Sequence, residues 1–117
     1  MKLDSAVFYS NDLEKAIEFH RDVMGFEVEY IQEGRFVSFI FPNGAKLGIK
    51  QRKEEREIPG HQTAFIAIKN AEEAFNKYKK MGLEFGKELT ELEGWGRYFS
   101  ILDPDKNKIE FIEHYKP

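Results

Sequence analysis

The sequence predicts an α+β domain made of two βαβββ modules with pseudo-two-fold symmetry, whose curved mixed sheets enclose a cleft. Three observations lead to this prediction. Strand-like and helix-like segments follow the same order in both halves of the 117-residue chain. Each half places a capping residue before its helix and a glycine after it. Residues of the two halves also match at fixed spacings. The whole chain, residues 1–117, is therefore interpreted as one domain built from two similar modules.

The first module spans residues 1–51. Apolar or alternating runs predict four strands, over residues 3–9, 26–31, 35–41 and 45–50. Asp12 is placed as an N-cap, and the apolar spacing after it predicts an amphipathic helix that Gly25 ends. A turn is predicted at residues 42–44, because Asn and Gly accept positive φ.

A charged segment, residues 52–60, is interpreted as a solvated linker. The second module then spans residues 61–117 and repeats the order of the first. Asn70 takes the place of the N-cap, residues 71–81 carry the helical stripe, and Gly82 ends it. The predicted strands cover residues 61–68, 83–89, 97–102 and 108–112, with a turn over 103–107.

The repeat can be followed residue by residue. At a spacing of 62 residues, Arg35 matches Arg97 and Ser38 matches Ser100. Earlier in each half the spacing is 58, and it pairs the two predicted N-caps. Short strands can resemble one another by chance, but shared caps and turns argue against that alternative.

Composition narrows the function classes. The chain has no cysteine, which excludes disulfides, cysteine-ligated zinc, iron–sulfur clusters and a thiol nucleophile. Its formal net charge of −3 disfavours nucleic acid as a partner, because nucleic acid favours a basic face. No apolar run approaches the roughly 20 residues of a membrane span, and the N-terminus lacks an apolar signal region. We therefore expect a cytoplasmic protein with neither nucleic-acid nor membrane partners.

Three segments resemble a known superfamily: residues 11–19, 23–27 and 103–112. With the paired βαβββ order, they resemble the vicinal oxygen chelate superfamily, which includes glyoxalase I, bleomycin-resistance proteins, fosfomycin-resistance enzymes and extradiol dioxygenases. The stretch from Gly94 to Ser100 is similar to one in bleomycin-resistance-like members, which favours that metal-free group. The resemblance implies the fold and a homodimer, but one scaffold hosts unrelated functions.

The resemblance also places four metal-ligand positions, at Ser5, Gly48, Thr63 and Glu110. In the family's metal enzymes these are usually His and Glu. Hydroxyl groups are poor ligands for Zn, Ni or Fe, and glycine has no side chain, so only Glu110 is suited. We therefore expect no cofactor. The alternative is a divalent metal in an altered site formed by Glu110 and His61, which lies on the same side of its strand as Thr63.

Strand parity predicts the lining of the cleft. If Ile101 lies opposite Glu110, Arg97 and Phe99 share the face of Glu110, and the repeat assigns Arg35 and Phe39 to the matching face. Aromatic rings would supply contact area, and a few charges would orient a ligand. The predicted ligand-binding residues are Ser5, Arg35, Phe39, Thr63, Phe65, Trp95, Arg97, Phe99 and Glu110.

The sequence is compatible with three functions. The first is binding or sequestration of a small aromatic or cationic molecule in the cleft, without chemistry. The second is a metal-dependent lyase, isomerase or dioxygenase with an altered metal site. The third is an interaction module whose cleft is filled by its own side chains. His20, in the first predicted helix, is interpreted as a packing residue rather than a catalytic one.

Overall fold

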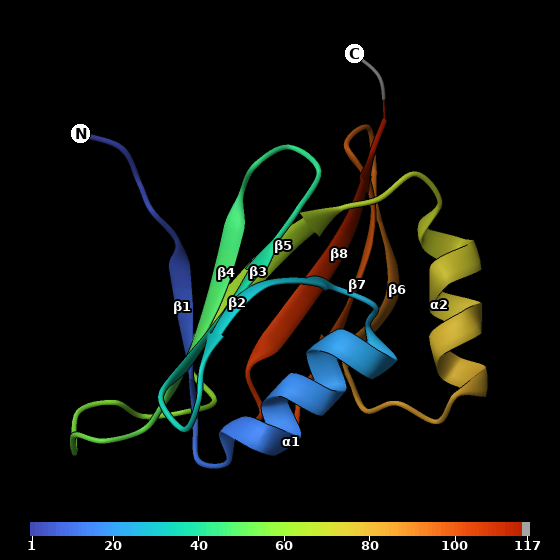
Figure 1. Cartoon of the computed structure of the whole chain (residues 1–117). Helices are drawn as coiled ribbons and strands as arrows, with labels where there is room; N and C mark the ends of the chain where they lie inside the picture. Colours follow the sequence, from blue (N-terminus) through green and yellow to red (C-terminus); the bar gives the residue numbers. More distant parts are fainter. Residues whose placement is uncertain (116–117) are drawn as a thin grey trace. The chain divides into compact units, whose positions relative to one another are not determined.

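A computed structural model describes residues 1–115 and divides into two compact units, each with its own four-stranded sheet (Figure 1). The first unit comprises residues 1–62 and 103–107. The second comprises residues 63–102 and continues from residue 108. The predicted α+β class and the order of elements in each half are confirmed.

The first unit contains the helical segments α1 (Leu13–Ile17) and η1 (Glu18–Val23) and the strands β1 (Ala6–Ser10), β2 (Glu27–Gln32), β3 (Phe36–Ile40) and β4 (Lys46–Gln51). The sheet has the strand order β1-β4-β3-β2. Strand β1 runs parallel to β4, and the other neighbours are antiparallel. One face of this sheet packs its alternate residues into a core with α1, among them Phe8, Val37, Phe39, Leu47 and Ile49.

The first helix begins where the sequence predicts. The side chain of Asp12 accepts a hydrogen bond from the backbone N–H of Lys15, which satisfies one of the donors that a helix start leaves free. After Ile17 the helix widens into the π-helix η1. Gly25 then ends it with φ of 77°, a value that glycine adopts without strain. The widened turn carries His20, which is fully buried.

The segment 52–60 is not a solvated linker throughout. Glu57 is only 5% exposed. Its carboxylate accepts hydrogen bonds from the backbone N–H groups of Lys53 and Glu54 and forms an ion pair with Lys50. The prediction was wrong for Glu57 because a run of charges in the sequence does not reveal a tertiary partner on a neighbouring strand.

The second unit contains β5 (Thr63–Ala67), α2 (Ala71–Lys80), β6 (Phe85–Leu92), β7 (Gly96–Leu102) and β8 (Lys108–His114). Its strand order, β5-β8-β7-β6, repeats that of the first unit. Asn70 caps α2 by accepting from the N–H of Glu73, as predicted. The helix lies along one face of the sheet (Figure 1), where Phe75 and Tyr78 contact Phe99.

The registers confirm the internal repeat. Ser38 pairs with Gly48 in the first sheet, and Ser100 pairs with Glu110 in the second, in keeping with the spacing of 62 residues. Ala6 pairs with Leu47 in the first sheet, and Ala64 pairs with Ile109 in the second. Ala6 and Ala64 are related by the spacing of 58 residues, and Leu47 and Ile109 by the spacing of 62. Equivalent positions of the two sheets can therefore be compared directly.

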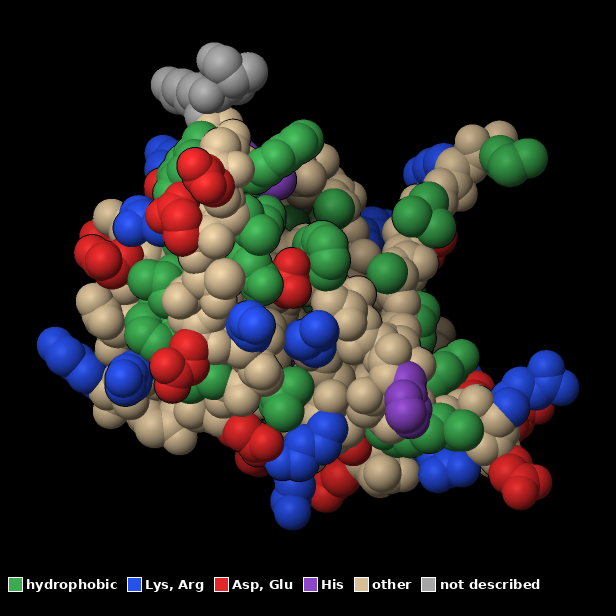
Figure 2. Space-filling view, turned by 180° about the vertical axis from the view of Figure 1, so that it is seen from behind, with side chains coloured by type: hydrophobic (Ala, Val, Ile, Leu, Met, Phe, Trp, Pro, Cys, Tyr) green, Lys and Arg blue, Asp and Glu red, His purple; other side chains and the backbone are tan. Residues whose placement is uncertain are grey.

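The surface carries charges of both signs. On the side shown in Figure 2, Lys and Arg side chains are interspersed with Asp and Glu, and apolar side chains lie between them. Across residues 1–115, no helix combines the length and the apolar character needed to cross a bilayer.

Candidate functional site

The strongest candidate site is on the second sheet, on the face that points away from α2, called here the distal face. Ser100 and Glu110 lie on this face, because their chain neighbours Phe99 and Phe111 contact α2 on the other face. Phe65 shares the face because it pairs with Glu110. The register aligns the three residues in one row: Phe65 pairs with Glu110, and Glu110 pairs with Ser100. Three adjacent strands thus bring a phenyl ring, a carboxylate and a hydroxyl side by side.

Two members of this row are in energetically unfavourable surroundings. The Phe65 side chain is 70% exposed, although exposing a large apolar side chain to water is unfavourable. Ser100 is fully buried, and within the described residues its hydroxyl has no hydrogen-bond partner. Such an orphaned hydroxyl costs about 1–3 kcal/mol. The equivalent Ser38 hydroxyl, by contrast, donates to Glu29 Oε1 at 2.8 Å.

Ser100 is a site residue that the sequence alone does not reveal. Its match with Ser38 indicates the repeat, but a serine in a strand carries no sign of a functional role. The sequence shows only that Ser100 follows Phe99 in a predicted strand. That position indicates a site residue only once the pairing of Ser100 with Glu110 is known.

Three of the predicted ligand-binding residues lie on the helix side of their sheets and not on the face predicted for them. Phe39 and Phe99 are fully buried on the helix side of their sheets. Arg97 shares the parity of Phe99 and forms ion pairs with Glu113 at 2.9 Å and with Glu72 of α2 at 4.0 Å. The prediction assumed that Ile101 lies opposite Glu110, whereas Ser100 does. A shift of one residue moves every side chain of a strand to the other face.

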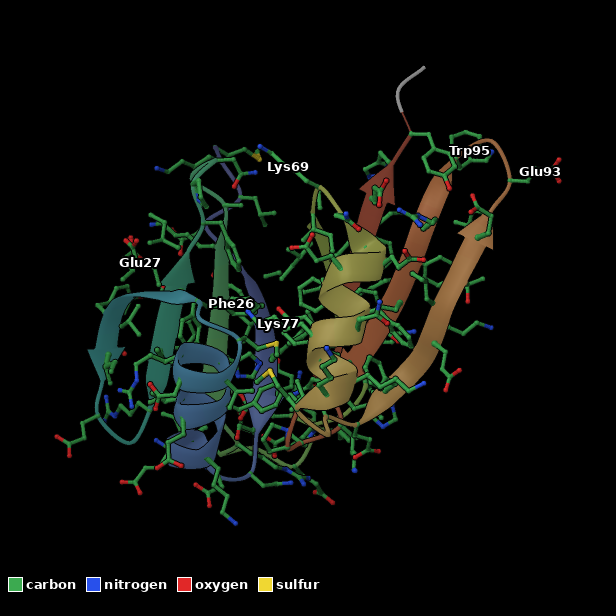
Figure 3. All side chains as sticks on the ribbon, turned by 90° about the vertical axis from the view of Figure 1, so that its right-hand side faces the viewer. Phe26, Glu27, Lys69, Lys77, Glu93 and Trp95 are labelled. Atoms are coloured by element: carbon green, nitrogen blue, oxygen red, sulfur yellow. The ribbon has the colours of Figure 1, made fainter. Side chains whose placement is uncertain are left out.

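Trp95, another predicted ligand-binding residue, is exposed but lies away from the row along the chain. It lies in the turn between β6 and β7 (Figure 3), and its side chain is 75% exposed. Gly96 and Ser100 are four residues apart on β7, which corresponds to about 13 Å along a strand. The backbone of Trp95 is therefore well separated from the row along β7.

The remaining predicted residues divide between the two units. Thr63 is exposed on β5 and shares the distal face with Phe65. Ser5 precedes β1 and is half-buried in the first unit. His61 is exposed and lies before β5 begins. Arg35 precedes β3 and borders a surface hollow of about 520 Å³ in the first unit.

The residues at the four family metal-ligand positions do not fit a transition-metal site. At Gly48, a Cβ would overlap the ring of Phe36, so the ring occupies the space into which a ligand side chain would extend. Ser5 and Thr63 offer only hydroxyls, and Glu110 is the single carboxylate among the four. Within residues 1–115, three or more His, Cys, Asp or Glu side chains do not cluster in a metal-binding arrangement. One carboxylate with two hydroxyls is a poor donor set for a transition metal.

A second polar cluster lies in the core of the first unit, on the helix side. His20 Nδ1 lies 2.7 Å from the carbonyl oxygen of Ala16, and its Nε2 lies 3.5 Å from Asp103 Oδ2. Burial lowers the pKa of His20 to about 4 and raises the pKa of Asp103 to about 6. The imidazole also contacts the rings of Phe8, Phe19, Phe26 and Phe39, which supports its interpretation as a packing residue.

Comparison with known proteins identifies the class. The model of the glyoxalase/bleomycin resistance protein/dioxygenase superfamily matches residues 2–111, so the chain belongs to that superfamily. Among solved structures, it is similar to a lactoylglutathione lyase from Agrobacterium tumefaciens, with a TM-score of 0.79, 20% identity and coverage of 96% of this chain and 92% of that one.

Two other structures match as well. TioX from Micromonospora sp. ML1 has a TM-score of 0.78 at 16% identity, covering 98% of this chain and 100% of its own. A superfamily member from Sphaerobacter thermophilus has a TM-score of 0.79 at 22% identity, covering 97% and 98%. At these identities, the likeness establishes the fold and not the reaction.

Proposed function

We propose that this protein binds a small aromatic cation on the distal face of its second sheet, and that it does so by capture, without a metal. The observation that carries the proposal is the row of Phe65, Glu110 and Ser100. An exposed ring offers stacking area and a carboxylate attracts positive charge, while the buried Ser100 hydroxyl next to them lacks a hydrogen-bond partner.

Each part of the row gains from such a ligand. An aromatic ring stacked on Phe65 removes apolar surface from water, and a cationic group near that ring adds a cation–π attraction. Glu110 is half-buried, so its attraction to a cation is screened less than that of a fully exposed carboxylate. Ser100 is fully buried, so a polar atom of the ligand would satisfy its hydroxyl only after the side chains that cover it move aside. Thr63, on the same face of β5, offers a further hydroxyl.

The test is a titration of ¹⁵N-labelled protein with phenyltrimethylammonium and then with larger aromatic cations. Benzyl alcohol serves as the uncharged aromatic. We expect saturable shifts of the backbone amides in residues 63–67, 98–102 and 108–112. Weaker binding of benzyl alcohol is expected because it lacks the charge that Glu110 attracts. If no aromatic cation shifts these amides, the proposed function is wrong.

Variants locate the binding. Phe65→Ala and Glu110→Gln should each weaken the binding about tenfold, since a stacked ring or a charge contact contributes about 1.4 kcal/mol. Met81→Ala and Glu93→Gln are matched controls, because both residues are exposed in the second unit and lie outside the row. Equal losses in the controls would show that the row is not the site.

The metal-dependent alternative has its own measurement. Elemental analysis of protein purified without chelator decides between the two. If the protein contains stoichiometric Zn, Ni, Mn or Fe, and Glu110→Gln and His61→Ala each lose it, the capture proposal is wrong. The protein is then a metal-dependent lyase, isomerase or dioxygenase. The donor set at the four family positions disfavours that outcome.

A further inference from the structure

A hollow of about 520 Å³ lies in the first unit where β3 begins and β4 ends, between the β2–β3 turn and the segment that follows β4. Volumes of a few hundred cubic ångströms are typical of small-molecule sites. We call it the basic hollow, because four cationic side chains and an aromatic ring border it: Arg35, Lys50, Arg52, Lys53 and Phe36.

The positive charge of the basic hollow is only partly compensated. Lys50 forms an ion pair with Glu57 at 2.5 Å. The Arg52 guanidinium donates 2.8 Å to the carbonyl oxygen of Glu55, a neutral acceptor that leaves its charge unbalanced. Among residues 1–115, the side chains of Arg35 and Lys53 have no hydrogen bond or ion pair. Within that described part of the chain, three of the four cationic residues that border the hollow therefore lack a carboxylate partner.

The walls of the basic hollow are held in place by hydrogen bonds of the surrounding chain. Gln51, at the end of β4, accepts from the N–H of Leu13 and donates to the carbonyl of Asn11. The N–H of Arg52 donates to the carbonyl of Ser10, and the N–H of Gln51 donates to that of Arg35. A pre-formed frame lowers the ordering cost of binding.

Phe36 supplies the apolar wall. It pairs with Lys50 across β3 and β4, and its ring lies over Gly48, where the missing Cβ makes room for it. An anionic group beside the cations would therefore have an aromatic surface next to it. This combination suits an organic anion better than a simple inorganic ion.

We propose that the basic hollow binds the oxyanion of a small organic molecule, a carboxylate or a phosphate ester, with its apolar part against Phe36. Arg35 and Lys53 supply the free charges, and Arg35 offers the planar donor pair that matches an oxyanion. Glu57 competes with the anion for Lys50. The hollow lies in the first unit and shares no residue with the aromatic-cation site proposed on the second sheet.

Calorimetry and ¹⁵N NMR with phenyl phosphate, benzoate and benzyl alcohol test the proposal. Both anions should shift the amides of residues 32–36 and 50–53. The phosphate should bind more tightly because it carries more charge, and binding should weaken as salt is added. Equal binding of benzyl alcohol, or shifts confined to residues outside the hollow, would overturn the proposal.

Substitutions make the test specific. Arg35→Gln and Lys53→Gln should each weaken phenyl phosphate binding about tenfold. Arg21→Gln and Lys15→Gln are the matched controls, because both residues are exposed on the helical segments of the same unit, outside the hollow. If the control variants lose phenyl phosphate affinity to the same extent, the loss comes from the change in net charge and not from the hollow. That result would overturn the proposal.

One variant should improve binding. In Glu57→Gln, the amide oxygen can still accept from the N–H groups of Lys53 and Glu54, so the segment keeps its shape, while Lys50 loses its carboxylate partner. We expect phenyl phosphate to bind about threefold more tightly, a change on the scale of one partly exposed ion pair. An unchanged NMR spectrum elsewhere shows that the fold is intact. If affinity then stays the same or falls, Lys50 does not face the anion and the proposal is wrong.

Discussion

The buried pair of His20 and Asp103 should give the stability of the protein two opposed pH dependences, which single substitutions separate. The His20 ring donates through Nδ1, because its partner, the Ala16 carbonyl, can only accept. In the neutral ring, the lone pair of Nε2 therefore points toward Asp103 Oδ2, 3.5 Å away. Two acceptors face each other unless one of them carries a proton.

Each member of the pair contributes a pH dependence of opposite sign. The pKa of Asp103 is raised from 3.8 to about 6, so the folded protein retains a proton that the unfolded chain releases. The stability from this carboxyl is present below pH 4 and is lost as pH rises through 6. The pKa of His20 is lowered from 6.5 to about 4, so stability is instead lost as pH falls from 6.5 to 4.

The two contributions are of similar size. Both side chains are fully buried, so the shifts can be converted without a correction for solvent screening. At about 1.4 kcal/mol for each pH unit, each shift corresponds to roughly 3 kcal/mol. Between pH 4 and 6 the two therefore nearly cancel, and we expect this pair to add little pH dependence to the wild-type protein.

Urea denaturation followed by far-ultraviolet circular dichroism, at intervals from pH 4 to 7, measures the effect. Relative to wild type, Asp103→Asn should gain roughly 3 kcal/mol in the free energy of unfolding as pH rises over this range, because only His20 then titrates. His20→Phe, which keeps an aromatic ring in place, should lose about as much, because only Asp103 then titrates. Taking the difference from wild type removes the contribution of all other groups.

The double variant is the internal control. His20→Phe with Asp103→Asn should show the same pH profile as wild type. Flat difference curves for both single variants, or slopes of reversed sign, would refute the reasoning. NMR titration of the His20 ring in Asp103→Asn offers a second readout, because a ring that titrates near its ordinary pKa would show that burial does not shift it.

Two further predictions concern the first sheet. Gly48→Ala should lower the free energy of unfolding by about 1–3 kcal/mol, because the added Cβ overlaps the Phe36 ring, and Phe36→Ala in the same chain should recover part of the loss in thermal melts. Glu57→Ala should destabilise the protein near pH 7 by leaving Lys50 and two backbone N–H groups without their acceptor. Lys50 and the backbone donors lower the pKa of Glu57 to about 2, so the difference in free energy of unfolding between wild type and Glu57→Ala should narrow only as pH falls from about 4.5 toward 2. A difference that stays constant over this range in urea denaturation would contradict the prediction.

Much of the fold could be predicted because its signals are local. Asp12 and Asn70 are N-caps, and Gly25 and Gly82 adopt the positive φ expected after a helix. A cap, a turn or an alternating strand depends on a few neighbouring residues, so each can be recognised in the sequence. The π-helix could not, because the widened turn has no distinct local pattern.

The candidate site was predicted in part. Phe65, Thr63 and Glu110 do share one face of the second sheet, because β5 and β8 alternate regularly. Phe99 and Arg97 were assigned to that face wrongly, since the pairing of β7 with β8 differs by one residue from the pairing assumed. Residue alternation determines which side chains share a face, but the register between two strands depends on the hydrogen bonds of the whole sheet.

By itself, the sequence determined the duplicated βαβββ order, the caps, the turn at residues 103–107 and the identities at the four family metal-ligand positions. Only the tertiary structure decided which face each β7 residue takes, that Phe36 covers Gly48, and that Arg35 and Lys53 meet at one hollow. It also decided that His20 faces Asp103. The physical reason is that local patterns depend on backbone geometry, whereas burial, pairing and pKa depend on residues that are distant in the chain and become neighbours only on folding.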